Sequence, residues 1–182
     1  MKKAYVFLAT GFEETEATAT IDVLRRGGVE AITVSITGKR SVAGAHGIAV
    51  EADALFEDIA GADADALILP GGGPGSQMLN GHEPLKQLLV QHSEQNKLVA
   101  AICAAPLVLG GLGLLKGKKA TCYPGIEPLL TGAILATDQP AVVDGHIITG
   151  KGPGLAFDFA LEVLAALAGK NVAAGVAGDL LL

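Results

Sequence analysis

Cys103 stands at the end of the apolar run 98–102 and directly before a helix-like run. A thiol at such a junction lies over the first turn of a helix, where unpaired backbone N–H groups and the helix dipole favour an anion. This is the environment that makes a thiolate reactive. The small residues Ala101, Ala104 and Ala105 suit a sharp turn, as in the nucleophile elbow of serine hydrolases. The segment predicts a reactive cysteine; the alternative is a buried thiol that acts as a small apolar side chain.

Three carboxyl groups, Glu13, Glu14 and Glu16, crowd the start of the first expected helix. The helix dipole favours negative side chains there, so capping and solvation account for Glu13 and Glu14. Glu16 differs because it lies beside the apolar stripe of this helix and can point toward the strand ends. Near a thiolate, burial and like charge would both raise its pKa, so that it would stay protonated and donate a hydrogen bond to sulfur. We expect Glu16 and Cys103 to form a carboxyl–thiolate pair.

The glycine-rich segment 70–75 offers backbone N–H groups that can approach a ligand closely. It lacks the spacing of a dinucleotide fingerprint and the Gly-Lys-Ser/Thr of a phosphate-binding loop. The simpler interpretation is an oxyanion site formed by the N–H groups of Gly72 and Ala104. The Gly-Pro-Gly of residues 152–154 opens the last long helix, either as part of a site or as a plain helix start.

Four histidines are candidates for the base of a Cys-His pair: His46, His82, His92 and His146. His82 and His92 belong to a polar helical segment, and His146 follows a hairpin turn. None of the four histidines directly follows Cys103. None lies at an evident strand end later in the chain, where it could reach the sulfur. The sequence therefore does not support a Cys-His hydrolase.

Short apolar runs alternate with longer segments of helical period, which is typical of a parallel sheet covered by helices on both faces. The expected strands are 5–9, 31–36, 66–69, 97–102, 119–122, 133–136, 141–143 and 147–149, with a short antiparallel hairpin between 40 and 51. The expected helices are 14–26, 84–95, 104–109, 155–168 and a short one after 170. Sites in open sheets form beyond the carboxyl ends of the strands, so the glutamates, the glycine segment and Cys103 should converge there.

The chain has 182 residues, half of them hydrophobic, and a net charge of -6. This length favours a single domain over residues 1–182. No cluster of basic residues could track phosphates, so nucleic acid is not an expected partner. The uncharged run 98–115 contains a proline and three glycines and favours a strand and a helix over a membrane span. Neither a secretion signal nor metal-ligand spacing of the two cysteines is evident, so we expect a cytoplasmic protein with reduced thiols and no metal.

Five segments of the chain together resemble one known family. They are ATGFEETE at 9–16, IDVLRRGG at 21–28, LPGG at 69–72, AAICAAP at 100–106 and GPG at 152–154. In this order, over about residues 3–175, they closely resemble the ThiJ/PfpI superfamily in its parkinsonism-associated deglycase branch. The resemblance implies a flavodoxin-like three-layer sandwich, with a mostly parallel central sheet, helices on both faces and a cysteine nucleophile elbow, which forms a homodimer.

The resemblance also implies a site. Cys103 would stand on a strained elbow, Glu16 would be its protonated partner, and the amides of Gly72 and Ala104 would line the pocket. The other expected pocket residues are Gly71, Tyr123, Gly152, Pro153, Arg26 and His46. Arg26 would lie near both the site and the dimer contact, and Cys103 would oxidise readily to a sulfinate.

The chain departs from the family pattern at three positions. Peptidase-like members carry a histidine where this chain has Ala104, which argues against proteolysis. Several members have a pocket histidine where this chain has Tyr123, which cannot shuttle a proton near neutral pH. His46 replaces an arginine of some members, so anion binding there should be weaker.

Three functions follow from these residues. The first is cofactor-free processing of small α-oxoaldehydes, of the glyoxalase or deglycase type, by Cys103 and Glu16. The second is a redox-sensing stress-response protein or chaperone, regulated by oxidation of Cys103. The third is a class I amidotransferase-like hydrolase, which would need a histidine beside the sulfur.

Overall fold

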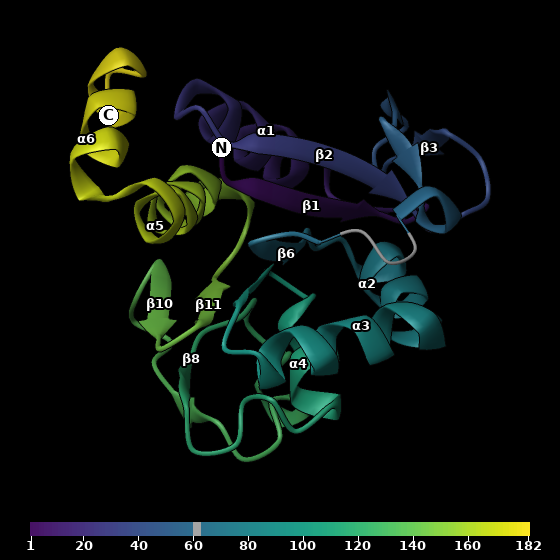
Figure 1. Cartoon of the computed structure of the whole chain (residues 1–182). Coiled ribbons are helices and arrows are strands. Elements are labelled where there is room, and N and C mark those ends of the chain that lie inside the picture. Colours follow the sequence, from purple (N-terminus) through teal and green to yellow (C-terminus); the bar gives the residue numbers. More distant parts are fainter. Residues whose placement is uncertain (60–62) are drawn as a thin grey trace.

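The computed structural model describes residues 1–59 and 63–182 (Figure 1). Its main sheet has seven strands in the order β10-β11-β7-β6-β1-β2-β5. These strands are β1 (Lys3–Leu8), β2 (Glu30–Ser35), β5 (Ala54–Leu55), β6 (Ala66–Leu69), β7 (Leu98–Ile102), β10 (Ala141–Asp144) and β11 (Ile147–Gly150). Only β10 is antiparallel to its neighbour. Two small sheets pair β3 (Ser41–Ala43) with β4 (Ala49–Glu51), and β8 (Lys119–Ala120) with β9 (Ile134–Leu135).

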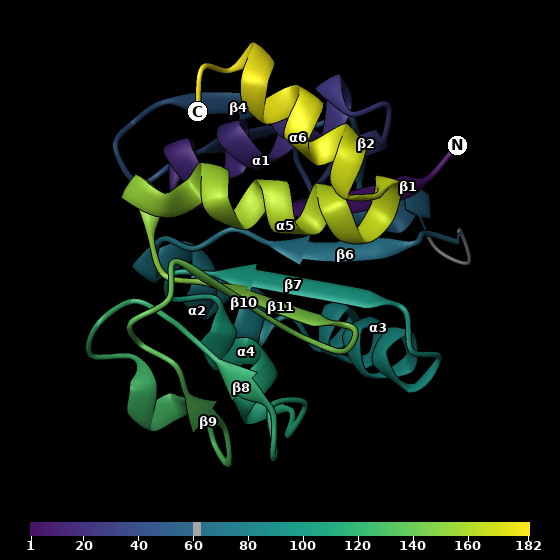
Figure 2. The same cartoon turned by 90° about the vertical axis from the view of Figure 1, so that its left-hand side faces the viewer.

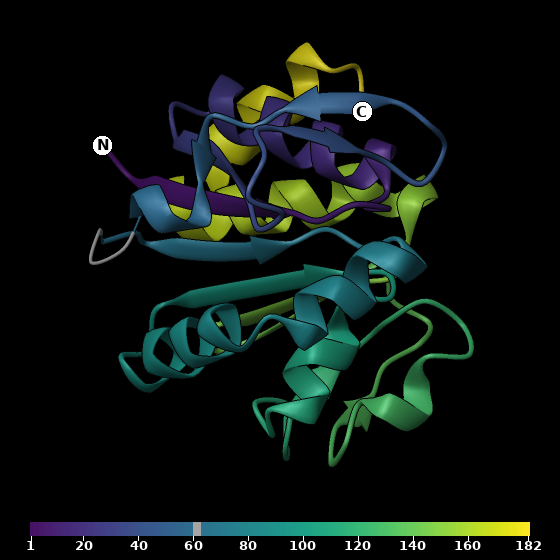
Figure 3. The ribbon, with the colours of Figure 1, turned by 90° about the vertical axis from the view of Figure 1, so that its right-hand side faces the viewer.

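The helices form a layer on each face of this sheet. They are α1 (Glu14–Arg26), α2 (Gly73–Gly81), α3 (Glu83–Glu94), α4 (Pro106–Gly111), α5 (Ala156–Ala168) and α6 (Lys170–Asp179). Helices α1 and α5 cover one face, with α6 packed on α5 (Figure 2). Helices α2, α3 and α4 cover the other face (Figure 3).

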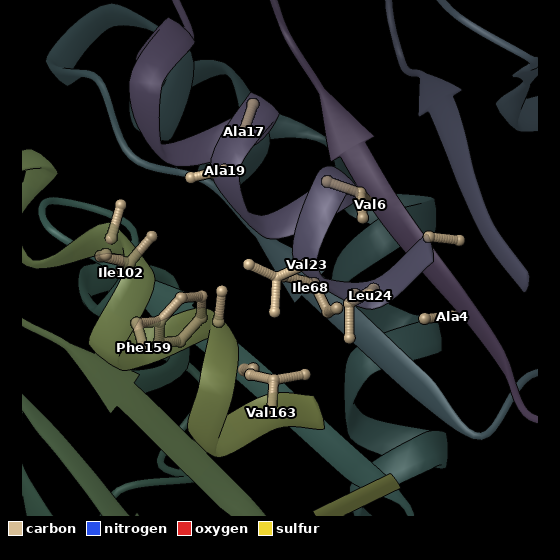
Figure 4. Close-up of a cluster of buried hydrophobic side chains, with 14 of the residues drawn as sticks. Ala4, Val6, Ala17, Ala19, Val23, Leu24, Ile68, Ile102, Phe159 and Val163 are labelled. Carbon is tan, nitrogen blue, oxygen red and sulfur yellow. The ribbon is translucent and has the colours of Figure 1, made fainter. Parts of the chain in front are cut away.

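The core is divided by the sheet into two apolar clusters, because successive side chains of a strand point to opposite faces. In β1, Val6 belongs to the cluster under α1 and α5, whereas Phe7 belongs to the other. In the first cluster, Val23 and Leu24 of α1 lie close to Val163 of α5 (Figure 4). Burial on both faces explains why β1, β6 and β7 are continuous apolar runs in the sequence.

The predicted α/β sandwich is confirmed, as are the 40–51 hairpin and the division of 98–115 into β7 and α4. Helix α2 is the main error, because residues 73–75 were expected to be loop. Its first turn is Gly-Pro-Gly, a composition of very low helix propensity, and Gly72 precedes it with a φ of 90°. Strand β5 and the 3₁₀ turns Phe56–Ile59, Glu127–Leu129 and Pro153–Leu155 were not predicted, since each is too short to show a period.

The strand order brings three expected site segments to one edge of the sheet. Strand β1 lies between β2 and β6 in the sheet. The chain first adds β2 on one side of β1 and later adds β6 on the other side, so the strand order reverses at β1. Ligands bind at such a reversal, beyond the carboxyl ends of the strands. Glu16 follows β1, Gly71 follows β6 and Cys103 follows β7. Within the described ranges, no helix combines the length and the apolar character needed to cross a membrane.

Candidate functional site

Cys103 occupies a sharp turn between β7 and α4. Its φ is +65°, a left-handed conformation that costs an L-residue about 1–2 kcal/mol. Two hydrogen bonds hold the turn: the N–H of Cys103 donates to the carbonyl of Gly150 (2.9 Å), and the N–H of Tyr123 donates to the carbonyl of Cys103 (2.9 Å). Residue Cys103 is only 8% exposed. The elbow therefore fixes the sulfur in a protected position.

Glu16 is fully buried in the first turn of α1. Its Oε2 accepts a hydrogen bond from the N–H of Gly71 (2.8 Å), and its own N–H donates to Oε2 of Glu13 (2.7 Å), the N-cap of the helix. Its Oε1 is buried and has no hydrogen-bond partner among the described residues. One carboxyl oxygen is therefore fixed by the protein, and the other is available to carry a proton.

Gly71 separates Cys103 from Glu16. A Cβ atom at Gly71 would stand 2.6 Å from Cβ of Cys103 and 2.6 Å from Oε2 of Glu16. The next residue is equally constrained, because a Cβ at Gly72 would lie 2.3 Å from the carbonyl oxygen of Gly11, and its φ of +90° favours glycine. These two glycines permit the close approach of the three chain segments that form the site.

The thiol and the carboxyl oppose each other's ionisation. Burial, the charge of Glu16 and a hydrogen bond with Glu16 raise the pKa of Cys103 to about 12, although the N–H groups of Gly72 and Ala104 lower it. Burial raises the pKa of Glu16 to about 7, against the lowering effects of the hydrogen bonds with Cys103 and Gly71.

The sequence predicts a thiolate that is stabilised by helix N–H groups beside a protonated Glu16, and the structure shows what opposes ionisation of the thiol. The N–H groups do lower the pKa of Cys103, but burial and the neighbouring carboxylate outweigh them. The charge of Glu16 opposes ionisation of the thiol, so the two groups do not readily ionise together. Above about pH 7 the pair therefore carries one negative charge, which lies mainly on Glu16, and the reactive thiolate forms when this carboxylate takes the proton of the thiol.

Tyr123 and Gly152 lie beside the elbow. A Cβ at Gly152 would be 3.2 Å from Cδ2 of Tyr123, so the ring packs against this glycine. The side chain of Tyr123 is half exposed, while its N–H is bonded to Cys103. Pro153 begins the 3₁₀ turn that leads into α5. The structure thus brings Gly71, Gly72 and Ala104 to the thiol, and places Tyr123 and Gly152 beside the backbone of the elbow.

Arg26 does not join this group. It ends α1, ten residues after Glu16, and a helix rises about 1.5 Å per residue, so that roughly 15 Å separate the two backbones. Its Nε donates to Asp22 (2.7 Å) on the same helix, and both side chains are about half exposed. Within one chain, Arg26 therefore lies away from Glu16 and Cys103, and its predicted place between the site and a dimer contact stays a prediction.

His46 contacts Glu14, and no hydrogen bond joins it to Cys103 in the described ranges. Its Nδ1 is 2.8 Å from Oε2 of Glu14, and its ring is exposed. Glu13, Glu14 and His46 also form the one group with metal-ligand spacing in the described part of the chain, with ligand atoms within 4.8 Å of one another. Both oxygens of Glu14 already accept hydrogen bonds from the hairpin, which leaves few free lone pairs for a cation.

The other histidines are engaged elsewhere. His82 caps α3, where its Nδ1 accepts from the N–H of Leu85 (3.2 Å), and His146 shares a hydrogen bond with Ser93 (2.9 Å). His92 is buried in α3, and burial lowers its pKa. No histidine is a hydrogen-bond partner of Cys103 within the described residues, so the base of a Cys-His hydrolase is missing from the position where it would act.

The sequence did not reveal the roles of two residues that hold the site. Gly150, which was not singled out, accepts the hydrogen bond of the Cys103 N–H. Glu14, for which capping and solvation were expected, is instead buried under the 41–51 hairpin. The position of Gly150 directly after the expected strand 147–149 was a weak indication of its role. Nothing close to Glu14 in the sequence indicates its burial, since its hydrogen-bond partners lie more than 30 residues further along the chain.

Comparison with known proteins agrees with this geometry. The model of the DJ-1/PfpI family matches residues 2–166. Protein DJ-1 homolog B of Arabidopsis thaliana is 40% identical over 182 residues, which are 100% of this chain and 42% of that protein. The chain therefore spans less than half the length of this curated relative.

Solved structures also match this chain over its whole length. Drosophila melanogaster DJ-1beta has a TM-score of 0.95 and 36% identity, and the match covers 100% of this chain and 98% of that one. Toxoplasma gondii DJ-1, described as oxidized, has a TM-score of 0.95 and 35% identity, with 100% and 98% covered. The architecture is thus shared over the whole chain.

Proposed function

Since this chain belongs to the DJ-1/PfpI family, we propose that it processes small α-oxoaldehydes such as methylglyoxal by means of Cys103 and Glu16. The observation that carries the proposal is the packing of the thiol and the buried carboxyl on either side of Gly71, with the N–H groups of Gly72 and Ala104 close to the sulfur. This arrangement supplies a nucleophile, a proton carrier and donors for an oxyanion. The scheme requires no metal or cofactor.

In the first step the Cys103 thiolate forms a bond to the aldehyde carbon. The carbonyl electron pair moves to the aldehyde oxygen, which the N–H groups of Gly72 and Ala104 stabilise while negative charge develops. Glu16 donates its proton to this oxygen. The product is a neutral hemithioacetal, and the negative charge now lies on the carboxylate of Glu16.

In the second step Glu16 takes the proton from the former aldehyde carbon and returns it to the neighbouring carbon. The hydroxyl proton passes to the other oxygen, so that the hemithioacetal becomes a thioester of a 2-hydroxy acid without any external oxidant. The raised pKa of Glu16, about 7, suits a group that must both accept and donate a proton near neutral pH.

In the last step water attacks the thioester carbon and the carbon–sulfur bond breaks. Glu16 takes a proton from the water, and the Cys103 thiolate leaves. The products are the 2-hydroxy acid and the starting thiolate with a protonated Glu16. The net reaction is the addition of one water molecule to the α-oxoaldehyde.

The test is lactate formation from methylglyoxal by the unchanged protein, Cys103→Ala, Glu16→Gln and Cys122→Ala. Cys122 is the second buried cysteine and serves as the matched control. We expect losses of about 100-fold or more for the first two variants, the range for a lost nucleophile or proton carrier, and no loss for the control. Equal rates in all four proteins would overturn the proposal.

Redox sensing by Cys103 is the second candidate, and the oxidized state of the Toxoplasma relative favours it. Peroxide would oxidise the thiolate stepwise to a sulfinate, whose oxygens the protonated Glu16 and the nearby N–H groups could bind. Mild peroxide should then add two oxygen atoms to Cys103 and none to Cys122, and Glu16→Ala should weaken this selectivity. Equal oxidation of both cysteines would exclude this candidate.

The homodimer is part of the same proposal. Ile48 in the hairpin is exposed, and apolar side chains that remain exposed on a monomer are compatible with an interface. Sedimentation equilibrium should give twice the mass of the chain. The mass of one chain at micromolar concentration would refute a stable dimer.

A further inference from the structure

Glu14 fastens the β3–β4 hairpin to the N-terminus of α1. Its Oε1 accepts hydrogen bonds from the N–H groups of His46 (2.6 Å) and Ile48 (3.4 Å), and its Oε2 lies 2.8 Å from Nδ1 of His46. The residue is only 6% exposed. A buried carboxylate is costly unless donors surround it, and here the turn of the hairpin supplies them.

The backbone of the hairpin is shaped around this carboxylate. A Cβ at Gly44 would stand 2.3 Å from Oε1 of Glu14, so a larger residue would displace the side chain. Next to it, the N–H of Ala45 donates to the carbonyl of Phe12 (2.8 Å), and the N–H of Gly11 donates to the carbonyl of Ala43 (2.8 Å). The hairpin therefore holds the loop of residues 11–13 from one side.

The same loop holds the glycine segment from the other side. The N–H of Glu13 donates to the carbonyl of Gly71 (3.0 Å), and the N–H of Gly75 donates to the carbonyl of Gly11 (3.1 Å). Gly71 in turn donates its N–H to Oε2 of Glu16, and Glu13 caps the N–H of Glu16. A continuous series of contacts thus leads from His46 to the carboxyl of Glu16.

We infer that Glu14 and His46 are positioning residues, which hold the carboxyl of Glu16 against Cys103 by fixing loop 11–13 between the hairpin and Gly71. Neither residue touches the thiol. The inference rests on the proposed role of Glu16 as the proton carrier. Glu14 takes no part in the proposed chemical steps, and this positioning role explains why it is buried.

The electrostatics agree with a fixed contact. Although burial raises the pKa of Glu14, hydrogen bonds from the His46 side chain and from the hairpin backbone lower it to about 2. The hydrogen bond and charge of Glu14, together with the charge of Glu13, raise the pKa of His46. Glu14 therefore remains ionised at every pH at which the protein would act.

The test is the pKa of Glu16, measured by carboxyl carbon NMR during a pH titration, in the unchanged protein, Glu14→Ala, His46→Ala and His46→Arg. Asp22→Asn is the matched control, because Asp22 forms an ion pair on the same helix at its far end. We expect the alanine variants to shift the pKa of Glu16 from about 7 toward its ordinary value by about one unit or more, since a loosened carboxyl regains water. His46→Arg should restore the raised pKa of Glu16, and Asp22→Asn should leave this pKa unchanged.

An unchanged pKa of Glu16 in His46→Ala would overturn the inference, even if hydrogen exchange in the hairpin becomes faster. The side chain of His46 is exposed, so His46→Ala should fold. If Glu14→Ala does not fold, the pKa of Glu16 in His46→Ala alone tests the inference. The proposed function fails separately, if lactate formation survives Glu16→Gln. An ordinary pKa of Glu16 in the unchanged protein would overturn both.

Discussion

Oε2 of Glu16 accepts a 2.8 Å hydrogen bond from the backbone N–H of Gly71, a residue 55 positions further along the chain. This bond joins the first turn of α1 to the end of β6 and fixes the orientation of a fully buried carboxyl. It also leaves Oε1 without a hydrogen-bond partner among the described residues, so this oxygen is available to carry a proton. The chemistry proposed for the site depends on this relationship.

Gly71→Ala should separate the two reactive groups. The added Cβ would meet Cβ of Cys103 and Oε2 of Glu16, each at 2.6 Å, so one of them must move. We expect aldehyde turnover to fall at least about 10-fold and stability to fall by about 1–3 kcal/mol, as for other overpacked sites. Steady-state kinetics and urea unfolding measure the two effects.

Gly73→Ala is the control for that variant, because a Cβ there meets no atom within 4 Å. It lies at the start of α2, where alanine should stabilise the protein by about 0.5–1 kcal/mol without affecting turnover. A Gly71→Ala protein as active as Gly73→Ala would show that the spacing of the thiol and carboxyl is unimportant.

Cys103→Gly and Cys103→Ala should differ in stability, although both lack the thiol. Alanine must adopt the φ of +65°, which costs about 1–2 kcal/mol, whereas glycine adopts it freely. Part of this gain is offset by the greater freedom of glycine in the unfolded chain. We expect the glycine variant to be the more stable by about 0.5–1 kcal/mol in urea unfolding. A more stable alanine variant would mean that the elbow relaxes once the sulfur is removed.

Glu16→Gln should change how stability depends on pH. Because the pKa of Glu16 is raised in the folded protein, its contribution is fully present below about 4.5 and is lost as the pH rises through about 7. At about 1.4 kcal/mol per unit, this loss amounts to about 3 kcal/mol. Relative to the unchanged protein, the glutamine variant should gain stability between pH 4.5 and 7. Parallel stability curves from urea unfolding at several pH values would contradict the raised pKa.

Much of the architecture could be predicted because apolar runs indicate buried strands and a helical period of apolar residues indicates helices. Strands β6 and β7 and helices α1 and α5 are long or strongly patterned, and strand ends indicate where a site forms. Helix α2 was not predicted because its N-terminal Gly-Pro-Gly is typical of loops. In the structure it packs against α3 and α4, and the N–H of Gly75 donates to the carbonyl of Gly11.

The charge state of the site could not be predicted from the sequence. A strand–helix junction favours a thiolate, but the extent of burial and the distance to Glu16 decide the pKa, and both arise from segments far apart in the chain. For the same reason the sequence did not show that, within one chain, Arg26 lies at the opposite end of α1 from Glu16. Its predicted place at a dimer contact stays a prediction. The contact between Glu14 and His46 likewise depends on how the hairpin folds back over α1.

The most direct test of the shared charge is the pH dependence of Cys103 alkylation by iodoacetamide, with the labelled cysteine identified by peptide mass. In the unchanged protein we expect a rise in rate near pH 7, where the pair loses its first proton, and a second rise near pH 12. Glu16→Gln should abolish the rise near pH 7. A single rise between pH 8 and 9, at about the pKa of an ordinary cysteine and the same in both proteins, would contradict the account.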